Sequence, residues 1–132
     1  MKEKDMKELI LTTIIVFGLS NTATAKAVVF GCNFTEYFSP DNKTAEKPNK
    51  AFEITFSYDT VTKEAFMTGK NGVSTVGAFT GTDGVTFYEL LMSGTIQTTT
   101  IQFSDLSVVH SRHTMMLNEI VPSQFYGKCT QE

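Results

Sequence analysis

Hydrophobic and polar residues alternate along much of this chain. The clearest case is AFEITFSY, residues 51–58, where Phe52, Ile54, Phe56 and Tyr58 are separated by polar or charged residues. A period of two is typical of a β-strand with one buried face. No window of helical length keeps apolar residues at i, i+3 and i+4. The pattern therefore predicts an all-β protein.

Turn-forming pairs interrupt the alternation about every ten residues. Asn71-Gly72, Asp83-Gly84 and Ser93-Gly94 are examples, and such pairs favour tight hairpins because their residues tolerate positive φ. The segment 39–50 contains two prolines and no apolar periodicity, so it predicts a loop. The pieces between turns give eight expected strands, near residues 27–36, 51–58, 62–68, 73–80, 85–92, 95–103, 107–117 and 120–127.

These strands, joined by hairpins, predict an antiparallel meander. Unpaired sheet edges favour aggregation, and this favours a small closed or nearly closed barrel of about eight strands, with a two-sheet sandwich as the alternative. Aromatic and methionine side chains are the expected core: Phe52, Phe56, Phe66, Met67, Phe79, Phe87, Met92, Met115 and Phe125.

The N-terminal segment resembles a secretion signal. An apolar run from Leu9 to Leu19 precedes Ala23-Thr24-Ala25, a small-x-small pattern cut by signal peptidase. The run is shorter than the roughly 20 residues that cross a bilayer as a helix, and no later segment is long enough. We therefore expect residues 1–25 to be a signal peptide, residues 26–132 to form a single β domain, and the protein to be periplasmic or secreted, without a transmembrane segment.

The chain contains two cysteines, Cys32 and Cys129, near the two ends of the expected domain. An isolated cysteine pair in an oxidising compartment favours a disulfide, which here would join the first strand to the last. Two cysteines alone lack the further ligands that zinc requires. The formal net charge of −3, without a basic cluster, argues against nucleic acid as a partner.

The sequence HSRH, residues 110–113, concentrates groups capable of chemistry. On a strand, successive side chains point to opposite faces, so His110 and Arg112 would share one face while Ser111 and His113 share the other. The two histidines would then not bind one metal. Ser111 and His113 could act as nucleophile and base, but no G-x-S-x-G turn or orienting acid accompanies them.

A second polar strand contains Thr95, Gln97 and Thr99 on one face. Paired with the HSRH strand across a hairpin, it would form a polar patch, which is the best candidate for a binding site. The patch comprises Thr95, Gln97, Thr99, His110, Arg112 and His113. Arg112 would be its energetic anchor, because arginine is enriched at interface hot spots. We expect the histidines, with an ordinary pKa near 6.5, to make contacts there sensitive to mild acid.

Two resemblances carry further expectations. The stretches HSRHT and PSQFYGKC, residues 110–114 and 122–129, resemble the ending of small secreted bacterial proteins of uncharacterised role, which implies an exported bacterial protein. One cysteine in the first strand, a β meander and a second cysteine at the end are also similar to periplasmic inhibitors of c-type lysozyme, which implies an eight-stranded barrel. The S-G-x-x-Y loop of those inhibitors has only Val76-Gly77-Ala78-Phe79-Thr80 as its nearest match.

The leading expectation is thus a non-enzymatic exported barrel that binds a protein or a small ligand, without a cofactor or metal. An envelope hydrolase using Ser111 and His113, or a protein similar to the lysozyme inhibitors, is the alternative.

Overall fold

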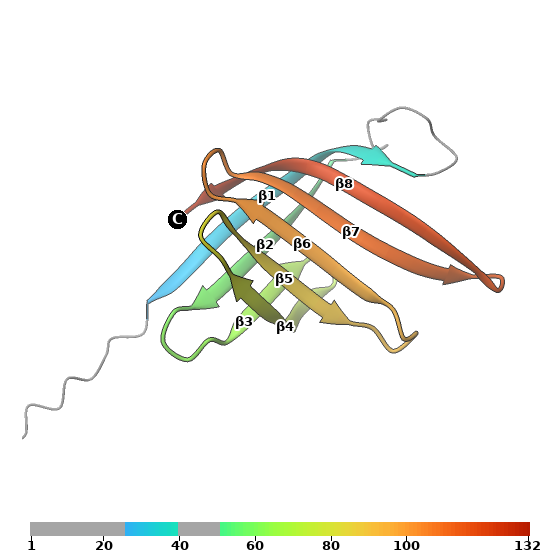
Figure 1. Ribbon diagram of the computed structural model, residues 1–132, viewed down its shortest axis with the longest axis horizontal. Coiled ribbons are helices and arrows are strands. Elements are labelled where there is room, and N and C mark those ends of the chain that lie inside the picture. The colour runs from blue at the N-terminus through green and yellow to red at the C-terminus, as the bar shows by residue number, and fades with distance from the viewer. Residues whose placement is uncertain (1–25, 40–50) are drawn as a thin grey trace, which may run out of the picture.

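A computed structural model describes residues 26–39 and 51–132. Each strand pairs antiparallel with the next, and the last pairs with the first, so that the sheet closes into a barrel (Figure 1). This confirms the all-β closed barrel rather than the sandwich. The strands are β1 (Ala27–Phe38), β2 (Phe52–Asp59), β3 (Ala65–Gly69), β4 (Gly72–Thr80), β5 (Gly84–Leu90), β6 (Ile96–Gln102), β7 (Ser107–Met116) and β8 (Glu119–Gln131).

Most strand bounds lie within two residues of those predicted, and two differ by more. β3 begins at Ala65 rather than at residue 62, because Asp59 Oδ1 accepts hydrogen bonds from the backbone N–H groups of Val61 and Thr62. These bonds, with Lys63 at a φ of 66°, extend the turn. β8 continues to Gln131 because its C-terminal half pairs with β1.

The seam between β1 and β8 closes the barrel. Cys32 lies directly opposite Cys129 in the register, and their Sγ atoms are bonded at 2.03 Å. Gly127, nearby on β8, packs so closely against β1 that a Cβ atom there would overlap the carbonyl oxygen of Asn33. Gly127 therefore permits the close approach of the first and last strands, and the disulfide joins them covalently.

The core is formed by the residues that face inward at one end of the barrel. Among the predicted core residues, Phe56 and Phe87 are buried, while Phe52, Met67 and Phe125 are partly buried against them. The unpredicted core members include Phe30, Phe34, Val85, Ile101 and Val108.

Four predicted core residues are exposed, so their assignment is wrong. Phe66 and Phe79 alternate with the inward-facing Ala65 and Ala78, and therefore point outward. The other two, Met115 on the outer face of β7 and Met92 in the β5–β6 turn, are exposed as well. Residue type alone does not predict burial here, because the position of a residue along its strand decides whether its side chain points into the barrel or out of it.

The predicted signal peptide and nearly all of the predicted loop 39–50 lie outside the described residues. In the residues that the structure does describe, we find no helix long and apolar enough to cross a membrane.

A candidate ligand cavity at the open end of the barrel

The polarity of the barrel interior changes from one end to the other. Strands β5 to β8 place their inward-facing residues in rows that the register defines. The first row is apolar, the second is mixed and the third is polar: Val85, Ile101, Val108 and Gly127; then Phe87, Thr99, His110 and Phe125; then Glu89, Gln97, Arg112 and Ser123. The interior is therefore a hydrophobic core toward one end, where a second hollow of about 320 Å³ opens, and a polar cup at the other.

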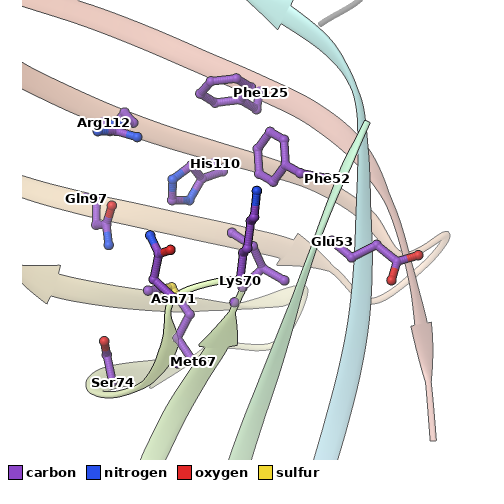
Figure 2. A pocket seen from close by; sticks show the side chains of 13 residues that line it. Phe52, Glu53, Met67, Lys70, Asn71, Ser74, Gln97, His110, Arg112 and Phe125 are labelled. Atoms are coloured by element: carbon purple, nitrogen blue, oxygen red, sulfur yellow. The ribbon is translucent and has the colours of Figure 1, made fainter. Parts of the chain in front are cut away.

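The cup contains a cavity of about 450 Å³. It lies between the β3–β4 turn, which contributes Lys70 and Asn71, and the strands β6 and β7, which contribute Gln97, His110 and Arg112 (Figure 2). This volume is within the range of roughly 300–1,000 Å³ that small-molecule sites occupy. The residues that line it are Phe52, Glu53, Ile54, Met67, Gly69, Lys70, Asn71, Gly72, Ser74, Gln97, His110, Arg112 and Phe125.

His110 lies at the base of this cavity and is only 4% exposed. Its Nδ1 is 2.7 Å from Thr99 Oγ1, and its ring packs against those of Phe34 and Phe125 at centroid distances of 5.8 and 6.1 Å. Burial, and then the charge of Arg112, lowers the pKa of His110 to about 4. His110 is therefore a neutral side chain at neutral pH and in mild acid, contrary to the expected sensitivity near pH 6.5.

Gln97 is held in place by a carboxylate. Its Nε2 donates a hydrogen bond to Glu89 Oε2 on the neighbouring strand β5. With the amide nitrogen engaged there, the carbonyl oxygen of Gln97 remains the group that can accept a further hydrogen bond.

Arg112 lies directly opposite Gln97 in the β6–β7 register, and its side chain lines the cavity (Figure 2). The salt bridge found among the described residues joins Lys128 to Asp105 on the barrel exterior, and none involves Arg112. The guanidinium is therefore available to a ligand as far as the described part of the chain is concerned.

The structure brings together four of the six residues of the predicted polar patch. Gln97, Thr99, His110 and Arg112 share the inner face of β6 and β7, as the predicted hairpin pairing required. Thr99 and His110 are buried inside the barrel, so this part of the patch does not lie on the outer surface of the sheet.

The other two patch residues lie elsewhere. Thr95 precedes β6, is buried in the β5–β6 turn, and has its Oγ1 2.9 Å from Ser93 Oγ. His113 is exposed, and the alternation along β7 puts it on the outer face, away from Arg112. The predicted patch is therefore not one surface: four of its residues lie inside the barrel, Thr95 lies in a turn, and His113 lies on the outside.

Ser111 and His113 share a shallow outer hollow of about 240 Å³. Its other lining residues are Phe38, Pro122, Ser123 and Gln124, which include no carboxylate. No hydrogen bond joins Ser111 to His113 in the described structure, and no cluster of three His, Cys, Asp or Glu side chains suited to a metal occurs in the ranges 26–39 and 51–132.

Sequence reasoning missed several residues of the cavity. Residue type predicts Phe52 and Phe125 as core, and it gives no role to Ser74 and Lys70, which also line the cavity. The alternation of side chains along each strand could have identified the inner face. Val108 lies on the same face as His110, and Ile101 lies on the same face as Thr99, so these apolar residues indicate a face that is buried.

No protein-family model, curated protein or solved structure matches this chain. The resemblance to small secreted bacterial proteins and the similarity to lysozyme inhibitors therefore stay predictions.

Proposed function

We propose that this protein is an exported, non-enzymatic binding module whose barrel takes a small ligand in the cavity at its open end. The observation that carries the proposal is the cavity of about 450 Å³ that combines an apolar wall with the inward-facing polar groups of Gln97, His110 and Arg112. Concave, mostly apolar sites with a few convergent polar groups are typical of small-molecule binding. The bonded cysteine pair is compatible with an oxidising compartment.

Several features favour a small ligand over a macromolecular partner at this site. Its polar groups lie on the inner faces of β6 and β7 and line a cavity of about 450 Å³, a volume typical of small-molecule sites. The outer hollow with Ser111 and His113 has no carboxylate in its lining to orient a histidine base, so it gives little support to the hydrolase alternative.

A cavity-filling substitution tests the proposal. Ser74 lines the cavity from β4, while the next residue, Thr75, is exposed on the same strand. With the neutral fluorescent probe N-phenyl-1-naphthylamine, we expect saturable binding to the parent and the loss of that binding in Ser74→Phe, because the phenyl ring occupies the site. Fluorescence titration measures both.

Thr75→Phe is the matched control, since it adds the same ring to the outside of the same strand. It should bind the probe as the parent does. Equal binding by Ser74→Phe and the parent, with both folded by circular dichroism, would contradict a ligand site inside the barrel.

A further inference from the structure

The residues that line the cavity carry two positive charges, on Arg112 and Lys70, and one negative charge, on Glu53. Arg112 lines one side, and Lys70 enters from the β3–β4 turn, where Figure 2 shows its side chain running into the cavity. Glu89 is not among the residues that line the cavity; its carboxylate keeps its charge and accepts a hydrogen bond from the Gln97 amide. Glu53 points away from the other labelled side chains in the same view (Figure 2).

An apolar wall faces these cations. The rings of Phe52 and Phe125 meet edge to face, with centroids 5.0 Å apart and planes at 81°. Ile54 and Met67, from the same side of the barrel, also line the cavity. A ligand that filled this space would therefore place a hydrophobic body against the aromatic pair while its polar end met Arg112.

His110 suits the same kind of ligand because burial keeps its ring uncharged at neutral pH. When the Thr99 hydroxyl donates to Nδ1, the ring proton resides on Nε2, which makes that atom a hydrogen-bond donor. The base of the cavity then offers a neutral donor that needs no counter-ion.

We propose that the ligand is an organic monoanion with an apolar body, whose anionic group binds Arg112, assisted by Lys70, and whose body packs on Phe52 and Phe125. This rests on the proposed function, because it specifies the ligand of the same cavity. Charge-assisted hydrogen bonds from a guanidinium to a carboxylate or sulfonate are stronger than neutral ones and fix the orientation of the ligand.

Two probes with the same aromatic body separate charge from hydrophobicity. 8-Anilinonaphthalene-1-sulfonate carries one negative charge, and N-phenyl-1-naphthylamine carries none. The anionic probe should bind the parent about tenfold more tightly than the neutral one, and Arg112→Gln should weaken its binding by about tenfold, the low end for a charge-assisted contact because the site is open to solvent.

The neutral probe should bind Arg112→Gln and the parent within about twofold, because it makes no use of the charge. His113→Gln is the matched control, since it changes the adjacent residue on the outer face of β7 and should leave both affinities unchanged. Lys70→Gln should weaken only the anionic probe, and added salt should reduce that difference.

The outcomes distinguish the two proposals. If both probes are blocked by Ser74→Phe but bind equally tightly, or if Arg112→Gln leaves the anionic probe unaffected, the preference for an anion is wrong while the cavity remains a ligand site. If Ser74→Phe blocks neither probe, the ligand site itself is wrong.

Discussion

Replacing Cys32 and Cys129 together with alanine is expected to lower the free energy of unfolding by roughly 3 to 5 kcal/mol. The bond closes a loop with a sequence separation of 97 residues, so it restricts the unfolded chain strongly. The backbone pairing of β1 with β8 remains in the variant, which should therefore still fold, with a lower stability. Urea denaturation followed by circular dichroism measures the difference.

Reduction of the parent with dithiothreitol provides the control for this experiment. The reduced parent should be destabilised about as much as the double alanine variant, and the reductant should have no effect on that variant. A loss below about 1 kcal/mol in both cases would show that the disulfide contributes little to the closure of the barrel.

Lowering the pH from 6.5 to 4 should destabilise the parent by about 3 kcal/mol through His110 alone. The pKa of His110 in the folded protein is about 4, because burial penalises its charged form, whereas the unfolded chain takes up the proton near pH 6.5. Stability that is fully present above pH 6.5 is therefore lost as the pH falls toward 4. The free energy of unfolding at several pH values, from urea titrations, measures this loss.

His110→Gln should remove most of this pH dependence, whatever its effect on stability at pH 7. His113→Gln keeps His110, so it should lose as much free energy of unfolding between pH 6.5 and pH 4 as the parent does. The carboxylates of Asp59 and Asp105 also have a lowered pKa in the folded protein. Their contribution to stability is lost as the pH falls below the ordinary carboxyl value of 3.8, which lies below the pH range of these titrations. An equal pH slope in His110→Gln and the parent would mean that His110 is not buried in its neutral form.

The strands were predictable because two independent local signals agree. Alternation fixed the buried face of residues 51–58, and pairs such as Asn71-Gly72 marked the hairpins that divide the rest. The turn after Asp59 was placed less well, because its length depends on hydrogen bonds from Asp59 and on the positive φ of Lys63. These hydrogen bonds and this backbone angle are local features, but the residue types alone do not determine them.

The candidate site was half predictable. Pairing across a single hairpin put Gln97 opposite Arg112 and Thr99 opposite His110, as the sequence indicated. The sequence does not indicate that this face lies inside the barrel, because a row of polar residues is more often solvated than enclosed. The contribution of Phe52 depends on closure between β1 and β8, a contact between distant parts of the chain that no local pattern encodes.

The measurement that tests the ligand site most directly is an NMR titration of the ¹⁵N-labelled protein with 8-anilinonaphthalene-1-sulfonate. We predict that the largest shifts occur at the ring nitrogens of His110, at the side-chain amide of Gln97 and at the backbone amides of Ser74 and Phe125, all of which line the open end. Shifts confined to the hollow at the opposite end, lined by residues that include Tyr58 and Phe103, with no change at His110 or Gln97, would contradict a binding site in the cup.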